Sequence, residues 1–396
     1  MNLSQRFWEE IGKMSFKKTD RNMKTTYTKK TAILLFRNKG HYMHFARLLF
    51  RAFSEVSEVT FILTEAVAAS EEFQAEFGKD LDKISLLKTE RNEVQTLLSY
   101  AVKGDFNTIF SNALDSFWLK ILPKLLILKI FGCLKANIGG ILVSTGFAYP
   151  ENNNFSFKGV RCFLLKYFVP LAFHKFFLID EIAYQTLFPK GNKVCCLLND
   201  PVEDFSECSK FDLRKKYNWD PEKKILLAIG VMIPEKRMDL LVKAFLDSNI
   251  QSDRLLILAG KFDKSLYEEL QKMIQESPYG KQIILINRWL KNEEVNEMIA
   301  AADYISVAYA NHFSNASILF RSIKAGKFAL VSHNGWIGRY AKKYKCGVSV
   351  NIFSEESYRD GINKLFCHTG NLQTDWNANE HSESSFLDVI QKSYSK

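Results

Sequence analysis

The sequence lacks the features that mark several classes of protein. Its seven cysteines are odd in number, none are spaced as CxxC, and Cys195 and Cys196 are adjacent. This pattern argues against a disulfide framework or a zinc module and favours a reducing compartment. No uninterrupted apolar run reaches the length of a membrane span, and residues 1–10 lack the apolar segment of a secretory signal. We therefore expect a cytoplasmic protein.

Motifs of several enzyme classes are also missing. The sequence contains no HExxH, GxSxG or P-loop pattern, and we predict no metal site. The net charge is +10, which favours an anionic partner such as a phosphate ligand, a nucleic acid or an acidic membrane surface. The basic residues are diffuse and no RNA- or DNA-binding motif occurs, so we do not expect a nucleic-acid partner.

Acidic residues are almost absent from residues 116–179, where Glu151 is the single acid among eight Lys and Arg. Two Phe- and Leu-rich segments lie there, at 117–135 and 155–178. Interleaved basic and apolar residues are typical of helices that lie on an anionic membrane, which would place the protein peripherally on the inner face of the cytoplasmic membrane. Buried helices of a Phe-rich core share much of this pattern, so both interpretations stay open. Pro123 and Pro170 are expected to break the two segments.

What the sequence does contain is a repeated alternation of strands and helices. At 396 residues, 47% of them hydrophobic, the chain is long enough for two domains. The alternation predicts the α/β class, with two Rossmann-like domains and a cleft between them. We expect four parts: a basic lead-in at 1–30 with a helix near 7–14, an N-terminal domain at 31–200, a C-terminal domain at 201–365, and a tail with a helix at 366–396. The turn-rich segment at 199–204 marks the boundary between the domains.

Residues 303–338 are the most informative stretch of the chain. Their pattern is a buried strand at 304–308, a polar loop, a helix over 314–325 and a second strand. Ser314 or Ser317 is expected to cap this helix. In open α/β sheets, ligands bind at the carboxyl ends of the strands, and the free N–H groups at the start of this helix would suit a phosphate.

The second half of the chain resembles the C-terminal domain of nucleotide-sugar glycosyltransferases of the GT-B fold, in particular glycosyltransferase family 4. The resemblance covers about residues 195–355, and the first domain matches only in layout. The segments that carry it are Ile229-Gly230, Lys236, Asp239–Phe245, Leu256–Lys261, Ala301–Asp303, Ala325–Lys327, Val331-Ser332, Asn334-Gly335 and Lys345–Val348.

The chain departs from the family in three places. The family usually carries an Arg upstream of the loop lysine, and here Met232 and Ile233 occupy that area. The family carries two glutamates eight positions apart, the first associated with the donor sugar and the second with the ribose hydroxyls. Here the register places Phe313 and Arg321 at these positions. Phe313 accepts no hydrogen bond, and an arginine has only donors, although Arg321 is able to face a phosphate.

The resemblance implies a nucleotide-sugar donor and no further cofactor. Transfer of the sugar requires a neutralised diphosphate and a positioned acceptor hydroxyl. Lys236 is our first choice for binding the diphosphate, followed by the start of the 314–325 helix. The backbone at Arg288 and Trp289 would lie along the edge of the nucleobase. The full set of predicted donor-binding residues is Gly40, Gly230, Lys236, Arg288, Trp289, Ser314, Asn315, Ser317, Arg321, Asn334 and Gly335. His41, His174 and Asp180 are the candidates for catalytic roles, although a lone histidine is more often structural.

These features favour a glycosyltransferase that moves a sugar to a glycan or lipid-linked glycan, with retention implied by the family. Two alternatives stay open. A nucleotide-sugar epimerase of the same fold would not need the basic, Phe-rich segments. A catalytically silent subunit that binds a membrane or a partner enzyme would explain the missing glutamates.

Overall fold

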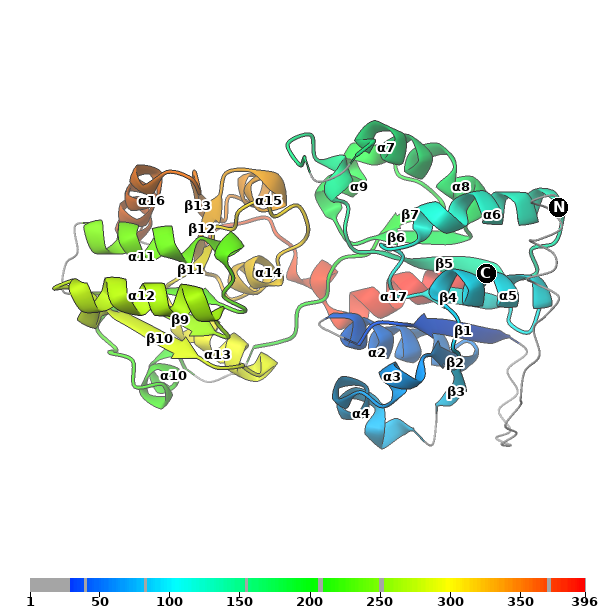
Figure 1. Ribbon diagram of the computed structural model, residues 1–396, viewed down its shortest axis with the longest axis horizontal. Coiled ribbons are helices and arrows are strands. Elements are labelled where there is room, and N and C mark those ends of the chain that lie inside the picture. The colour runs from blue at the N-terminus through cyan, green and yellow to red at the C-terminus, as the bar shows by residue number, and fades with distance from the viewer. Residues whose placement is uncertain are drawn as a thin grey trace.

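The computed structural model of the chain contains two parallel β-sheets, each with helices packed against it (Figure 1). It describes residues 29–38, 41–81, 84–153, 156–205, 209–248, 253–368 and 372–395. The expected α/β class with two Rossmann-like domains is confirmed. The helix expected near residues 7–14 lies outside the described residues.

The first domain has a seven-stranded sheet in the order β3-β2-β1-β4-β5-β6-β7. Its core strands are runs of apolar residues, because a parallel sheet is buried on both faces. The strands are β1 (Lys30–Leu35), β2 (Glu58–Leu63), β3 (Ser85–Lys88), β4 (Thr108–Ser111), β5 (Asn137–Leu142), β6 (Lys175–Leu178) and β7 (Cys195–Leu197). The helices are α2 (His41–Ser54), α3 (Glu65–Ala68), α4 (Glu71–Phe77), α5 (Glu93–Lys103), α6 (Trp118–Ile130), α7 (Lys158–Tyr167), α8 (Val169–Ala172) and α9 (Glu181–Leu187).

The second domain has a six-stranded sheet in the order β10-β9-β8-β11-β12-β13. The strands are β8 (Lys224–Ile229), β9 (Arg254–Gly260), β10 (Ile283–Asn287), β11 (Tyr304–Val307), β12 (Phe328–Ser332) and β13 (Gly347–Val350). The helices are α10 (Lys210–Lys216), α11 (Met238–Asp247), α12 (Lys264–Glu276), α13 (Asn292–Ala301), α14 (Ser317–Lys324), α15 (Gly335–Tyr344) and α16 (Glu355–Cys367).

Each sheet has one point where the strand order reverses, between β1 and β4 in the first and between β8 and β11 in the second. At such a point the loops that follow the two strands run in opposite directions and leave a crevice. The topology therefore creates a potential ligand site in each domain.

Two features of the sheets and helices differ from the sequence prediction. The edge strands β3 and β13 were not expected, because Ser85–Lys88 and Gly347–Val350 are too short and too polar to stand out as buried strands. Pro123 was expected to break its segment, but it lies inside α6. Proline removes only one helical hydrogen bond, and the buried side chains of Ile121, Leu122 and Leu125 hold α6 against the core on both sides of it.

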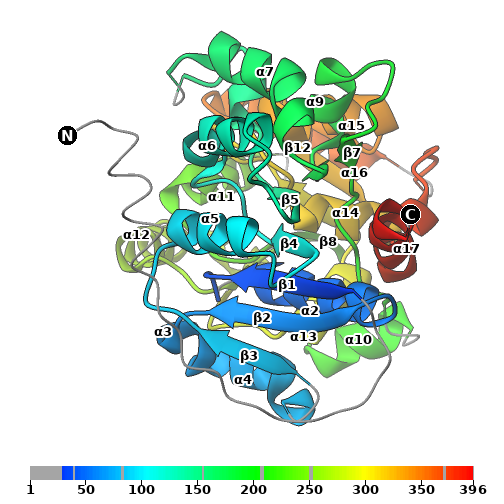
Figure 2. The ribbon, with the colours of Figure 1, turned by 90° about the vertical axis from the view of Figure 1, so that its right-hand side faces the viewer.

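The C-terminal helix α17 (Glu383–Tyr394) does not stay with the second domain. It crosses back and packs along α2 of the first domain (Figure 2). The Tyr394 ring lies 5.1 Å from the Phe53 ring, and the Phe386 ring lies 5.7 Å from the Phe45 ring. The chain thus passes between the two units twice, near residue 200 and again near residue 380, and we propose the first crossing as the division between them.

Candidate functional site

The loops that follow β8 and β11 enclose a cavity of about 260 Å³ at the reversal point of the second sheet. This is the carboxyl edge of the sheet, where open α/β folds bind their ligands. The cavity is lined by Ile233, Glu235, Lys236, Tyr309, Ala310, His312, Asn315, Ala316, Ser317 and Ile318. Three residues predicted from the sequence, Lys236, Asn315 and Ser317, are therefore brought together.

Lys236 is the charged centre of this cavity. Among the residues that the structure describes, no carboxylate forms an ion pair with it, and its ammonium lies over the Tyr309 ring, 4.7 Å from the centroid. Burial lowers the pKa of Lys236 to about 8. The ammonium also approaches Gly230, where a Cβ atom would lie 3.1 Å from Nζ, so Gly230 leaves it room. An incompletely solvated cation without an acid partner favours an anionic ligand.

The start of α14 lies beside Lys236, but it is not built as predicted. The helix begins at Ser317 rather than 314, and Ala316 occupies the N-cap position without a side-chain cap. Ser314 and Ser317 therefore do not cap the helix, because Ser314 lies two residues before the N-cap position and Ser317 lies one residue after it. The uncapped N–H groups at the start of α14 remain available to an anion.

Three further polar groups face this region. The Tyr309 hydroxyl and the Asn315 Oδ1 atom are buried without a hydrogen-bond partner in the described part of the chain. The His312 Nε2 atom lies 3.2 Å from the Asn315 carbonyl oxygen. Burial lowers the pKa of His312, and the charge of Lys236 lowers it further. A neutral imidazole, a hydroxyl and an amide are thus placed around one ammonium. Sequence reasoning missed Tyr309 and His312, although both lie in the polar loop that it singled out.

Residues 209–382, which include every strand of the second sheet, match the family described as glycosyl transferases group 1. The second domain is therefore similar in sequence to the group 1 glycosyl transferases. A comparison with curated protein sequences gives no significant match.

Solved structures show the same arrangement over nearly the whole chain. HepE of Anabaena, crystallised with UDP and glucose, aligns at a TM-score of 0.60 and 14% identity, covering 93% of this chain and 98% of that one. Sucrose-phosphate synthase of Thermosynechococcus elongatus aligns at 0.59 and 13%, covering 92% and 95%. A glycosyltransferase of Rickettsia africae aligns at 0.63 and 11%, covering 93% and 95%. The chain therefore has the GT-B fold, and its second half holds the region that matches the group 1 family.

The two positions where the family resemblance implies glutamates, Phe313 and Arg321, lie in different surroundings. The Phe313 side chain is 9% exposed, and its ring centroid lies 6.0 Å from that of Tyr149 in the first domain. Arg321 lies one turn into α14. Its guanidinium is 3.5 Å from the Asn292 side-chain oxygen, and the negative charges of Glu203 and Asp200 act on it. Phe313 thus packs against the first domain, and Arg321 faces Asp200 and Glu203 in the segment that joins the domains.

The residues after β10 are not part of the cavity lining. The Arg288 guanidinium pairs with Glu294 at 2.6 Å, while 71% of the Trp289 surface is exposed. This ion pair holds the pKa of Glu294 near 2. The loop lies at the same sheet edge as the cavity, so a role of its backbone or of the Trp289 ring toward a nucleobase stays a prediction.

Asn334 and Gly335, also predicted to bind the donor, begin α15 outside the cavity. The Glu151 carboxylate of the first domain accepts a hydrogen bond from the Gly335 N–H and is 2.9 and 3.1 Å from the Arg339 Nη2 atom. Gly335 has φ +71°, and a Cβ atom there would lie 2.4 Å from the His312 carbonyl oxygen. These residues therefore join the domains and hold the 312–313 loop in place.

The three predicted catalytic residues are not brought together. His174 lies at the amino end of β6, opposite the cleft, with its ring 5.3 Å from that of Tyr394, and this position argues against a role as general base. Asp180 follows β6 at the correct edge, but its side chain is fully buried. His41 begins α2 at the carboxyl edge of the first sheet, and Gly40 lies outside the described residues.

Asp180 is a structural carboxylate. It accepts hydrogen bonds from the Thr145 hydroxyl, from the Tyr149 hydroxyl at 2.8 Å and from the Ala183 N–H at 3.0 Å, and so caps α9. Burial raises the pKa of its carboxyl group. Through this hydrogen bond it is linked to Tyr149, whose ring packs against Phe313 across the domain interface.

We expect Asp180→Ala to lower the free energy of unfolding by about 2 kcal/mol, because it removes a helix cap and leaves two buried hydroxyls without an acceptor. Chemical denaturation monitored by circular dichroism measures the change. The exposed residue Asp105 provides the control, and Asp105→Ala should change stability by less than about 0.5 kcal/mol. Equal stability of the two variants would contradict the structural role.

Sequence reasoning also missed a polar cluster at the reversal point of the first sheet. The Arg37 guanidinium donates to the Tyr42 hydroxyl at 3.0 Å, and the Ser116 hydroxyl donates to the Glu93 carboxylate at 3.0 Å. Burial raises the pKa of Glu93 and of Asp115, which also accepts a hydrogen bond from the Ser144 N–H. These residues come from four separate loops, so no local motif could reveal them. They are better placed than His174 to meet an acceptor hydroxyl.

Proposed function

We propose that the protein transfers a sugar from a nucleoside-diphosphate sugar to a glycan or lipid-linked glycan. The observation that carries this proposal is Lys236, which has no acid partner among the described residues and lies beside the uncapped start of α14, in the region that matches the group 1 glycosyl transferases. The UDP and glucose in the HepE structure agree with this choice of ligand. The family 4 resemblance favours retention of the anomeric configuration.

The geometry suits departure of a diphosphate. The Lys236 ammonium and the N–H groups of α14 would neutralise the charge that develops on the leaving group. The neutral His312 and the unpaired Tyr309 hydroxyl would add hydrogen bonds. We place the acceptor on the Glu93–Asp115 side, because these residues lie at the carboxyl edge of the first sheet, where open α/β folds bind ligands. A raised carboxyl pKa suits a group that takes a proton from a sugar hydroxyl.

We further propose that the first domain lies on an anionic membrane through a surface formed by α6, α7 and α8, called the membrane face below. Part of the predicted apolar segments is buried, including Trp118, Leu125 and Phe176. Another part is exposed. Its exposed apolar residues are Ile127, Ile130, Phe131, Phe157, Val160, Phe163, Tyr167 and Leu171, interleaved with Lys120, Lys124, Lys158, Arg161 and Lys166. Among the described helices, none is long and apolar enough to cross a membrane.

Calorimetric titration with UDP, GDP, ADP and their glucose conjugates tests the donor proposal. We expect one nucleoside diphosphate to bind in a one-to-one complex, with its sugar conjugate binding as well, because Lys236 and α14 address the diphosphate common to both. The anomeric configuration of a product, read by NMR, then tests retention. Absence of binding by all of these nucleotides would sink the donor assignment.

Phe313 favours a second candidate, a GT-B protein that binds nucleotide without transferring sugar. Its ring fills the interface where the family resemblance implies a glutamate for the donor sugar. Hydrolysis and transfer assays with the nucleotide sugar that binds would separate the two. Binding without turnover in the presence of membrane extracts and glycan acceptors would favour the silent protein.

A further inference from the structure

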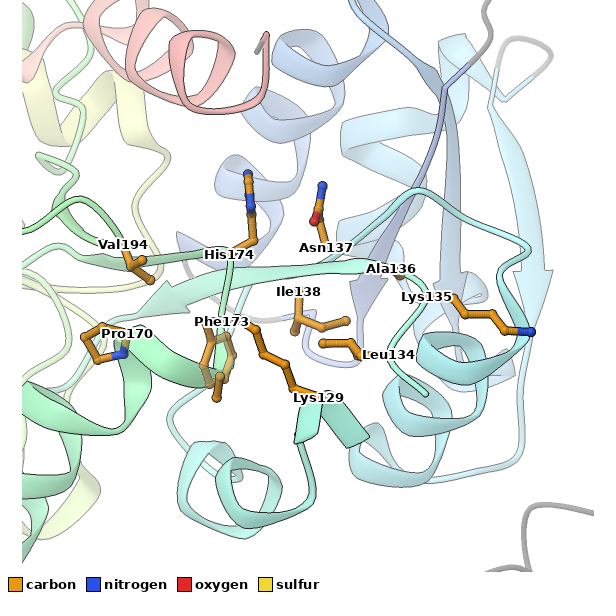
Figure 3. Close-up of a pocket in the computed structure, with 11 residues that line it drawn as sticks. Lys129, Leu134, Lys135, Ala136, Asn137, Ile138, Pro170, Phe173, His174 and Val194 are labelled. Atoms are coloured by element: carbon orange, nitrogen blue, oxygen red, sulfur yellow. The ribbon is translucent and has the colours of Figure 1, made fainter. Parts of the chain in front are cut away.

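A second cavity, of about 410 Å³, lies far from the donor site, at the amino ends of β5 and β6. It is lined by Lys129, Leu134, Lys135, Ala136, Asn137, Ile138, Pro170, Ala172, Phe173, His174 and Val194. Figure 3 shows Lys129 rising from the end of α6 past Phe173, while His174 and Asn137 point together toward the C-terminal helix and Lys135 turns outward. The cavity therefore lies between the edge of the sheet, α6 and α8.

The ionisable side chains that line this cavity are all basic. Its lining contains two lysines, a histidine and an amide but no carboxylate. Among the residues that the structure describes, no acid forms an ion pair with Lys129 or Lys135. The charges of Lys175 and Lys129 act on His174, whose ring also bonds to the Ser393 backbone. An anionic group in the cavity would meet several donors without an acid to repel it.

The other half of the lining is apolar and continues onto the membrane face. Ile138, Phe173 and Val194 form part of the wall, and Pro170 belongs to α8, whose Leu171 is 57% exposed. At the opposite rim, Lys129 is followed by Ile130 and Phe131, which are 78% and 73% exposed. A ligand held here would thus have its charged group beside the lysines and an apolar part along the exposed side chains.

We propose that this cavity binds the phosphate group of an anionic lipid. A phosphate headgroup has the negative charge that Lys129 complements, and Lys135 adds positive charge to the lining. The acyl chains fit the apolar surface that begins at the rim. The proposal extends the membrane face by a specific headgroup site and does not depend on glycosyl transfer. The cavity would fix one end of the membrane face, whereas the lysines along α6 and α7 act through diffuse charge.

Calorimetric titration with soluble dihexanoyl phosphatidic acid tests the proposal, with inorganic phosphate and dihexanoyl phosphatidylcholine as separate arms. We expect saturable one-to-one binding of phosphatidic acid that is about tenfold weaker in the Lys129→Gln/Lys135→Gln variant, because charge-assisted hydrogen bonds are lost. The Lys264→Gln/Lys272→Gln variant, with the same change of charge on the exposed surface of the second domain, should bind like wild type. Lys129→Arg should retain most of the affinity, and circular dichroism checks that each variant is folded.

Three results would overturn the proposal. The first is no binding of phosphatidic acid, or binding weakened equally by the control pair, which would show diffuse attraction. The second is equal binding of phosphatidylcholine, which would show apolar contact alone. The third is inorganic phosphate binding as tightly as phosphatidic acid, which would make free phosphate rather than a lipid the ligand.

Discussion

Lys236→Ala should weaken the binding of a nucleoside diphosphate by about 1–3 kcal/mol, because the charge-assisted hydrogen bonds to the diphosphate are lost. This corresponds to about 5- to 150-fold in Kd. Calorimetry of the wild type and the variant with the same nucleotide measures the change. Lys272 on α12, whose side chain is 76% exposed, provides the control, and Lys272→Ala should leave the affinity unchanged.

The same lysine predicts how affinity depends on pH. Burial lowers the pKa of Lys236 to about 8 in the free protein, and a bound diphosphate would favour the ammonium and raise that pKa. Affinity should therefore be highest below pH 8. It should fall as the pH rises above 8, because Lys236 must then take up a proton when the diphosphate binds. In Lys236→Arg, which stays charged, affinity should be flat between pH 7 and 9. Unchanged binding in Lys236→Ala would show that the nucleotide lies elsewhere.

Reversing three charges on the membrane face should nearly abolish binding to anionic vesicles. Lys120, Lys124 and Lys166 lie among its exposed apolar side chains, and each basic residue near a negative leaflet contributes about 1 kcal/mol. Their replacement by glutamate removes about 3 kcal/mol of attraction and adds repulsion, so the vesicle partition coefficient should fall more than a hundredfold. Flotation with vesicles of phosphatidylserine and phosphatidylcholine measures it.

The control carries the same change of charge on the other domain. Lys264, Lys272 and Lys281 are exposed there, and their triple replacement by glutamate should leave vesicle binding near the wild-type level. Wild-type binding should weaken with salt but not vanish, because the exposed rings of Phe131 and Phe163 insert without charge. Failure of the wild type to bind anionic vesicles at low salt, or equal losses in both triple variants, would contradict the membrane face.

Much of the fold is local in origin and was predictable. Strands such as β1 (Lys30–Leu35) and β9 (Arg254–Gly260) are mostly apolar runs next to turn residues, and periodic helices separate them. The two short edge strands were missed because only two of the four residues in each have apolar side chains. The α17 helix was predicted near its observed position, but its packing on the first domain depends on contacts with α2 that are more than 300 residues away in sequence.

The sequence alone determined that this protein has two α/β units, that its second half resembles a glycosyl transferase, and that Lys236 follows a strand at a ligand-binding edge. These properties follow from residue type and spacing along short segments. Only the tertiary structure decided that His174 lies at the wrong end of its sheet, that Asp180 is buried as a helix cap, and which rings of α6 and α7 remain exposed. Each of these depends on which distant segments pack together. The direction and burial of a side chain are set by neighbours that are far away in the sequence, and a local sequence pattern does not identify them.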